Sequence, residues 1–242
     1  TLFPYTTLFR LKGEARNGMV VFKGVPILYA PWLEFPLNGS SQSGFLPPTL
    51  GNTSNTGADI TLPYYLSLAP NYDLTLAPRL MSRRGLQLGT EGRYLTAQTR
   101  GILRTEYLPR DLVSNASRGL LTFNHQQNFD NGLSGFIDFN AVSHKDYFAD
   151  LSSKITSTSQ ANLNRQIVLS YGNGSWLSST LQVQRYQNLT GDTLYSRMPQ
   201  LSMLLRQPDL QGLSVQAPVE LTSFTHPTLD KGRRLVAYPQ IA

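Results

Sequence analysis

Cysteine is absent from the 242 residues, so no disulfide, thiolate zinc site or cysteine nucleophile can form within this sequence. Charged residues are scarce, at 15% against a typical share of about 25%. The apolar runs stay well short of the roughly 18 residues that a membrane-spanning helix needs, and no secretory signal sequence opens the chain. These absences exclude a spanning helix and predict a surface that is either neutral-polar or lipid-facing.

Residues for catalytic chemistry are also few. The three histidines are His125, His144 and His226, and none lies in a metal-binding or base-nucleophile spacing. The sequence contains neither a Gly-x-Ser-x-Gly elbow nor a phosphate-binding glycine loop. It therefore predicts no catalytic residue, no metal, no cofactor and no enzyme, and the histidines are interpreted as solvated loop or lumen residues.

The net charge of +6 and the pI near 9.6 favour an anionic partner, such as nucleic acid, acidic lipid or a phosphorylated glycolipid. Lysines and arginines are scattered rather than gathered on one face, which argues against nucleic acid. Serine, threonine, asparagine and glutamine are abundant, beside 19 glycines and 15 prolines. Such a composition favours strands and turns over helices, so the predicted fold class is all-β.

The chain divides into two regions of different texture. Residues 11–37 hold a compact hydrophobic segment, in which Pro26, Pro31 and Pro36 confine the expected strands to edges or corners. Residues 38–56 are rich in glycine, serine and asparagine, which is typical of a loop or linker. A domain boundary is therefore expected within that stretch.

From residue 57 onward the pattern becomes regular. In the first segment, residues 60, 62, 64, 66 and 68 are apolar while residues 59, 61 and 67 are polar, and about ten or eleven such segments, this one included, extend to the C-terminus. Their length matches the roughly 9–11 residues with which a β-strand crosses a bilayer. The polar face is mostly uncharged, as in a barrel lumen, and aromatics such as Tyr147 and Phe148 fall near expected strand ends. The pattern alone leaves a transmembrane barrel and a soluble two-sheet protein both open.

Several short sequence motifs are more specific. They are KGVPILYAPWLEFP at residues 23–36, SGFLP at 43–47, GADITLPYY at 57–65, LAPNYDLTLAPRLM at 68–81 and the pair Arg84-Gly85. In this order they closely resemble the LPS-assembly outer-membrane protein family (LptD), at the junction between its periplasmic β-jellyroll and its first barrel strands. From about residue 115 the match is to style more than to wording. The resemblance implies a transmembrane antiparallel β-barrel, incomplete with about ten strands present, preceded by the end of a periplasmic β-jellyroll.

The resemblance also implies domain boundaries. Residues 11–47 would be the C-terminal end of the jellyroll, 48–56 a linker, and 57–242 the N-terminal part of the barrel. Residues 1–10 match nothing in the family, so they stay unassigned and could be foreign to the gene. Because the strands are too few for the family's large barrel, we expect the chain to be a piece of a longer protein.

The function implied is assembly and transport of lipopolysaccharide (LPS) into the outer leaflet of the outer membrane, through a jellyroll groove and a lateral gate. Pro63 and Pro78 match the family's two gate prolines in motif and spacing. A proline donates no backbone hydrogen bond, so it can weaken one seam of the barrel wall for a bulky amphiphile. The alternative is that the two prolines merely mark bulges or strand ends.

Two groups of residues are candidate LPS contacts. The first would line the acyl-chain groove of the jellyroll, although a closed core would use the same residues: Val21, Ile27, Tyr29, Trp32 and Phe35. The second lies near the expected gate, where ordinary lumen or loop polarity is the alternative: Asp59, Tyr64, Asp73 and Arg79, with Arg83 and Arg84 beside them.

The resemblance further implies partners and a location. The partners would be LPS, an LptE-like outer-membrane lipoprotein plug, an LptA-like periplasmic bridge protein and outer-membrane lipid, with no nucleic acid. The chain would lie in the cell outer membrane, with its N-terminal segment in the periplasm. The alternative function is that of a general porin-like or structural outer-membrane β-barrel, which shares alternating strands and a polar lumen.

Overall fold

The computed structural model describes residues 12–22, 25–36, 41–151, 161–191, 193–210 and 213–241. Within residues 12–36, side chains are described only for residues 16–19. Apart from the short helix α1 (Tyr147–Leu151), the regular structure in these ranges is β-strand, which confirms the all-β prediction. In the same ranges, no helix has the length and hydropathy needed to cross a membrane.

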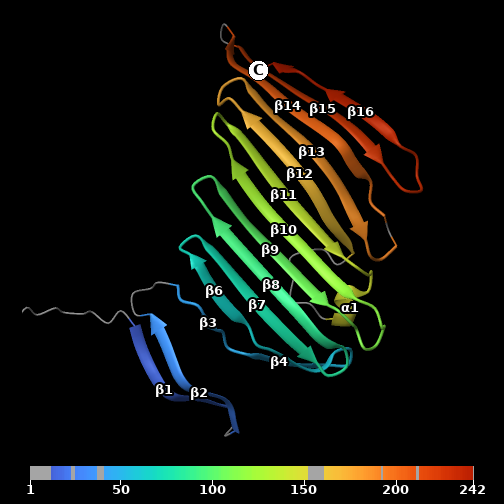
Figure 1. Cartoon of the computed structure of the whole chain (residues 1–242). Coiled ribbons are helices and arrows are strands. Elements are labelled where there is room, and N and C mark those ends of the chain that lie inside the picture. The colour runs from blue at the N-terminus through green and yellow to red at the C-terminus, as the bar shows by residue number, and fades with distance from the viewer. Residues whose placement is uncertain are drawn as a thin grey trace, which may run out of the picture.

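The first two strands form a sheet of their own. Strand β1 (Lys12–Phe22) pairs antiparallel with β2 (Val25–Pro36), with a shift of register between Val20 and Val21. Figure 1 shows this hairpin set apart from the main sheet. The segment predicted as the end of a jellyroll, residues 11–47, thus contains the hairpin and also β3 (Gly44–Phe45), which belongs to the other sheet.

All other strands join β3 in one large antiparallel sheet, in which each long strand hydrogen-bonds to the next along the chain. The strands are β4 (Thr49–Thr53), β5 (Gly57–Thr61), β6 (Tyr64–Ala69), β7 (Tyr72–Met81), β8 (Gly85–Leu95), β9 (Thr99–Leu108), β10 (Arg118–Asn128), β11 (Leu133–Val142), β12 (Asn162–Gly172), β13 (Leu177–Asn188), β14 (Ser196–Leu210), β15 (Leu213–Thr225), β16 (Gly232–Ala237) and β17 (Gln240–Ile241).

Nine of these strands, β7 to β15, have ten or more residues, close to the ten or eleven long segments that the alternation predicts. Their order in the sheet follows the sequence, because every connection, short or long, returns the chain beside the strand before it. The sheet is open: its path runs from β4 to β16, and no pairing joins these two strands within the described residues.

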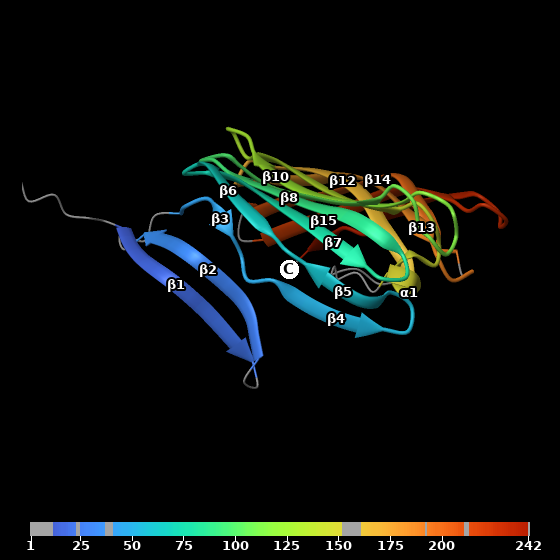
Figure 2. The same ribbon diagram turned by 60° about the horizontal axis from the view of Figure 1, so that its bottom comes forward.

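The sheet is curved into an arch, with α1 on its inner side (Figure 2). Register assigns each residue to a face. Ile137, Ile167 and Val183 stand side by side across β11, β12 and β13. The adjacent row lies on the other face and is polar, with Asp138, Gln166 and Gln184. The apolar row lies on the outer face, because α1 contacts residues of the polar face.

Two predictions need correction near the first strands. Residues 48–56, expected to be a linker, contain β4, which pairs with β5 from Thr49↔Thr61 to Thr53↔Gly57. The segment from residue 57 to 69, expected to be one continuous strand, is divided at Leu62 and Pro63 into β5 and β6. The first outcome is decided by strand pairing with a neighbour rather than by local composition. The second follows from Pro63, which has no N–H to donate to a ladder.

Candidate functional site: the proline-interrupted edge and its helix

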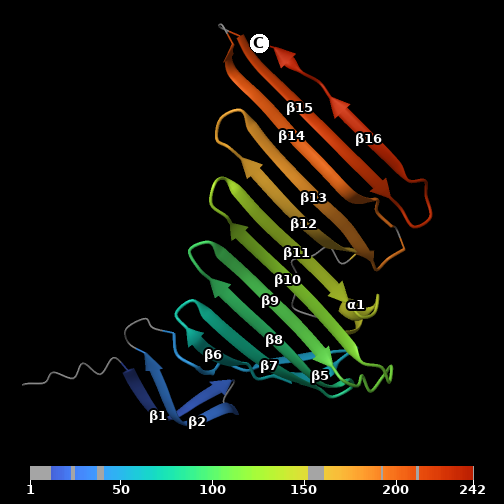
Figure 3. The same ribbon diagram turned by 45° about the horizontal axis from the view of Figure 1, so that its top comes forward.

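Pro63, between β5 and β6, and Pro78, in β7, lie almost opposite each other across one strand pairing. β5 and β6 pair with β7 in a single register, since Thr61 faces Arg79 and Tyr64 faces Leu76. Leu62 therefore faces Pro78, directly beside Pro63. Figure 3 shows β5 and β6 as successive segments that follow β7. The two prolines of the sequence motif thus lie at the same level along the strand direction.

Each proline removes one hydrogen bond from a different ladder. The Leu62 N–H donates to the Pro78 carbonyl at 3.1 Å, and in an antiparallel pair of this kind the partner would return a bond. Pro78 has no N–H to return. On the other side, the Leu46 N–H donates to the Pro63 carbonyl at 2.9 Å, and Pro63 likewise returns none. Two neighbouring ladders are therefore weakened side by side.

Two further prolines extend the interruption to a third strand. Phe45 faces Tyr64 and Thr49 faces Thr61, so three residues on one side, 46–48, stand opposite two on the other, 62–63. The extra residue makes a bulge at Pro47 and Pro48, between β3 and β4. We call the four residues Pro47, Pro48, Pro63 and Pro78 the proline line. It crosses the three strands nearest one edge of the sheet.

The charged candidates near the proline line are paired with one another. Arg79 binds Asp59 through two nitrogens, at 2.9 and 3.3 Å, and the two side chains are only 16% and 8% exposed. Arg93 of β8 binds Asp73 at 2.8 and 2.9 Å in a more exposed pair. Both ion pairs point to the inner face of the sheet. Asp59, Asp73 and Arg79, the charged candidates of the sequence, are therefore already neutralised by partners that the sequence alone does not indicate.

Tyr64 lies at the edge next to the proline line. Its ring packs edge-on against Phe45, with ring centroids 4.9 Å apart, and the side chain is half-buried. The other group of candidates, Val21, Ile27, Tyr29, Trp32 and Phe35, lies in β1 and β2, and the side chains of these residues are outside what the structure describes.

Helix α1 is docked against the inner face near the same edge. The Tyr147 hydroxyl donates to Glu106 at 2.8 Å and accepts a hydrogen bond from Gln87 at 3.0 Å. Tyr147 and Leu151 are fully buried, and they pack in a cluster with Met81 and Leu108. Tyr147 was expected at a strand end among interfacial aromatics. It is instead the main apolar anchor of a helix.

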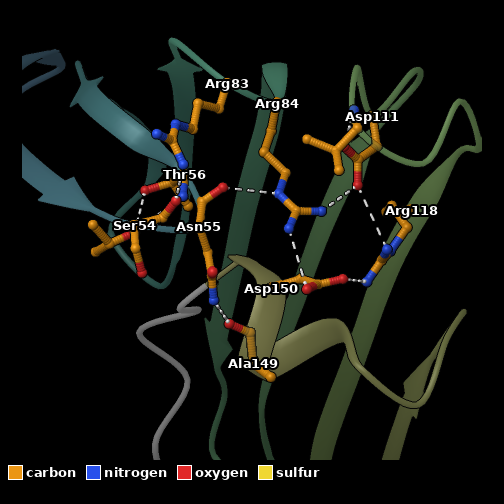
Figure 4. A network of polar contacts seen from close by, with 11 residues as sticks. Ser54, Asn55, Thr56, Arg83, Arg84, Asp111, Arg118, Ala149 and Asp150 are labelled. Atoms are coloured by element: carbon orange, nitrogen blue, oxygen red, sulfur yellow. Dashed lines mark hydrogen bonds and ion pairs between the residues drawn. The ribbon is translucent and has the colours of Figure 1, made fainter.

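Four charged residues from four segments fasten α1 further (Figure 4). Asp150 of α1 accepts bonds from Arg84 at 3.1 Å and from Arg118 at 2.9 Å. Both arginines also bind Asp111, at 2.7 and 3.5 Å. The side chains of Asp111, Arg118 and Arg84 are 0%, 4% and 6% exposed. Two arginines and two aspartates leave this buried network without net charge, which is the condition for burying such groups.

Asp111 is the centre of the network. Burial disfavours its charged form, but hydrogen bonds from the Val113 N–H, Arg84 and Ser114 outweigh this effect and hold the pKa of its carboxyl below the ordinary value. Burial, together with Glu106, raises the pKa of Tyr147. At neutral pH Asp111 is therefore ionised and Tyr147 keeps its proton for the bond to Glu106.

The last contacts of α1 reach the proline-interrupted edge, by which we mean strands β3 to β7 at one edge of the sheet. The Leu151 carbonyl accepts a bond from Arg79 of β7 at 2.8 Å, and Arg79 is the residue after Pro78. The Ala149 carbonyl accepts a bond from the Asn55 side chain, in the β4–β5 turn, at 2.7 Å. Arg84 in turn donates to the Asn55 carbonyl at 3.1 Å. The helix thus contacts β7, which contains Pro78, and the turn that leads into β5.

The histidines have structural surroundings. His125 hydrogen-bonds Tyr94, and His226 accepts bonds from the Thr228 and Leu229 N–H groups of its own loop. Within the described ranges, no group of three or more histidine, aspartate or glutamate residues is arranged to hold a metal ion.

Comparison with known proteins identifies the family. The profile of the LptD family, described as LPS transport system D, matches residues 116–242, which is more than half of the 242 residues. Three proteins named "LPS-assembly protein LptD" are similar over 95% of this chain: one from Azoarcus sp. (strain BH72) at 46% identity, one from Aromatoleum aromaticum at 47% and one from Chromobacterium violaceum at 44%. The chain spans 29–30% of the length of these relatives. The profile match over more than half of the residues shows that the chain belongs to the LptD family.

Proposed function

We propose that this chain forms part of an outer-membrane β-barrel that assembles and transports LPS into the outer leaflet, and that the proline line is its lateral gate. The observation that carries the proposal is the loss of two donors at one height in neighbouring ladders. The names of the relatives, LPS-assembly protein, support the substrate. An amphiphile with acyl tails and a charged head cannot cross a fully paired wall, so a weakened seam is what such a path needs.

The two faces of the sheet support a place in the membrane. Leu86, Leu103, Ile167, Leu181 and Leu221 are all more than two-fifths exposed, and the register puts them on the outer face. The inner face carries hydrogen-bonded polar side chains, for example Asn164 to Asp138 at 2.8 Å and Gln184 to Asn164 at 3.0 Å. An apolar outer face with a polar inner face is the arrangement of a membrane barrel.

Loop lengths support an orientation. At one end of the sheet the connections are short, at residues 70–71, 96–98, 129–132 and 173–176. At the other end the β4–β5 and β7–β8 turns, at 54–56 and 82–84, are also short, but the connections from β9 onward are longer, at 109–117, 143–161, 189–195 and 226–231. Outer-membrane barrels have short periplasmic turns and longer extracellular loops. The chain enters β3 at the short-turn end, since Gly44 pairs with Tyr65, and this agrees with a periplasmic N-terminal segment.

The candidate contacts follow from this orientation. The acyl chains would approach through the segment that contains Val21, Ile27, Tyr29, Trp32 and Phe35, and pass Tyr64 at the edge. The phosphorylated head would meet Asp59, Asp73 and Arg79 on the inner face. Because Arg79 is already bound to Asp59, a phosphate would have to compete with that carboxylate.

The remaining partners belong to the same proposal. An LptE-like lipoprotein would occupy the polar interior, an LptA-like protein would deliver LPS to the periplasmic segment, and outer-membrane lipid would cover the apolar face. A general porin-like barrel is the second candidate, because the β11–β12 connection folds inward as a constricting loop would. The prolines that interrupt two adjacent strands favour LPS transport instead.

Site-specific photocrosslinking in cells tests the proposal. The probe replaces Tyr64, Tyr29 or, as a distal control, Val183 on the outer face of β13, each in the complete gene product. We expect LPS adducts at Tyr64 and Tyr29 and none at Val183. A folded and inserted protein that gives no adduct at any of the three would favour the porin-like or structural barrel.

Replacing Pro78 by alanine should strengthen the gate. The new N–H can return the missing bond to the Leu62 carbonyl, and one backbone hydrogen bond contributes about 1 kcal/mol, or roughly a fivefold change in opening. We expect the yield of LPS adducts at a probe on Tyr64 to fall by about that factor. Pro70→Ala is the matched control, because Pro70 lies exposed in the β6–β7 turn. Equal yields from both variants would mean that the missing donor does not govern passage.

A further inference from the structure

The pairing of β5 with β7 is short for a strand at this position. Only Asp59, Ile60 and Thr61 face β7 before the chain reaches Leu62 and Pro63, and the pairing resumes in the same register at Tyr64 in β6. The pairing of β7 with β8, in contrast, runs over ten residues without a break. Beyond the three pairs, the ladder is continued at its other end by the Ser82 N–H to the Ala58 carbonyl at 2.9 Å and by the Arg83 N–H to the Thr56 carbonyl at 3.1 Å. A short ladder beside a missing donor should open more readily than the rest of the sheet.

Helix α1 compensates for this weakness from the inner side. One of its carbonyls is bound by Asn55, before β5, and another by Arg79, on β7. Arg79 also holds Asp59 of β5, so one guanidinium joins the helix to both strands. Any separation of β5 from β7 would have to stretch these contacts or move α1.

The helix itself is held mainly by the charged network and by Tyr147. Asp150 is the part of the network that belongs to α1, and its carboxylate spans Arg84 and Arg118. Asp111, in the β9–β10 loop, binds the same two arginines, so each arginine keeps one carboxylate contact when Asp150 moves away. Release of α1 would therefore leave the network with one excess positive charge, and not with two arginines that have no carboxylate partner.

We propose that α1 is a latch on the proline-interrupted edge: docked, it clamps β5 to β7, and undocked, it frees the β4–β5 hairpin. The consequence for LPS passage rests on the proposed function, but the clamping does not. The alternative is a helix that only fills the interior, in which case its release would leave the edge unchanged.

Hydrogen–deuterium exchange of the purified, membrane-reconstituted full-length protein tests the latch. Asp150→Asn removes the charge that binds both arginines. We expect exchange of the amides in residues 54–62 to become about tenfold faster, together with that of α1. Asp146→Asn is the matched control, because Asp146 is an exposed carboxylate in the same loop, four residues earlier. It should leave exchange in both regions unchanged.

A second variant distinguishes release of the edge from a general loss of stability of the sheet. Asn55→Ala removes only the side-chain bond to the Ala149 carbonyl and leaves the Asn55 carbonyl in place for Arg84. It should accelerate the same amides, 54–62, by a smaller factor, while residues 177–187 of β13 stay protected. Faster exchange confined to α1, or no change in either variant, would overturn the latch. If Asp150→Asn accelerates exchange throughout the sheet, the Asn55→Ala variant alone decides between a latch and a helix that only fills the interior.

The two proposals fail separately. Exchange at the edge is measured without LPS, so a positive result stands even if no LPS adduct forms at Tyr64. Conversely, LPS adducts at Tyr64, together with amide exchange in residues 54–62 that does not respond to release of α1, would support the lateral gate and contradict the latch.

Discussion

Replacing Asp111 by asparagine is expected to cost about 3–5 kcal/mol of stability, because it leaves two nearly buried arginines without their shared carboxylate. Asparagine has almost the same shape and can still accept the bond from the Val113 N–H, so the change tests charge rather than packing. The measurement is urea unfolding of the folded barrel in detergent micelles. Asp150 partly compensates, since it binds the same arginines, and this favours the lower end of the range.

Asp130→Asn supplies the control for this prediction. Asp130 is exposed in the β10–β11 turn, at the opposite end of the sheet, and its bond to Gln98 is long at 3.4 Å. Its replacement should change stability by less than about 0.5 kcal/mol. If the two variants unfolded at the same urea concentration, the network would hold α1 without stabilising the fold.

The same network predicts a pH dependence. The folded-state pKa of Asp111 lies below its unfolded value, so its contribution is complete at pH values above the ordinary carboxyl pKa. That contribution is lost as the pH falls through the lowered pKa. The wild-type protein should therefore lose more stability than Asp111→Asn when the pH is brought from neutral to about 3. Parallel losses in the two proteins would show that Asp111 is not the titrating group.

The second large effect is expected on the outer face. Ile167→Arg places a charge on the apolar face in the middle of β12, where a lipid-facing arginine costs about 2–4 kcal/mol. The fraction of the complete gene product that becomes folded and membrane-inserted in cells should fall sharply. Heat-modifiable mobility on gels reports that fraction.

Val168→Arg is the matched control, because Val168 is the next residue along the same strand and faces the polar inner side. The change in residue type is nearly the same, and only the face differs. We expect Val168→Arg to be tolerated much better. If Ile167→Arg inserted as well as Val168→Arg, the outer face would not be in contact with lipid.

Much of the fold follows from local pattern. Strict alternation over about ten residues makes a strand with two different faces, and successive antiparallel strands lie side by side. The order of β7 to β15 could therefore be predicted, and their number approximately, as ten or eleven against nine long strands. The positions of Pro63 and Pro78 are also sequence facts, and a proline removes a donor in any fold. What the pattern predicts less well is strand β4, because its residues, TLGNT, have a loop-like composition and become a strand only through pairing with β5.

The site divides in the same way. The family, the strands and the two prolines were determined by the sequence, since each depends on residues close together in the chain. Helix α1 was not, because five residues carry no helical periodicity, and Tyr147 looks like any strand-end aromatic. The network was not either: Arg84, Asp111, Arg118 and Asp150 are spread over four segments and meet only because strand register and the curve of the sheet bring those loops together. Burial then decides their roles, since charges removed from water must pair, and that requirement exists only in the folded chain.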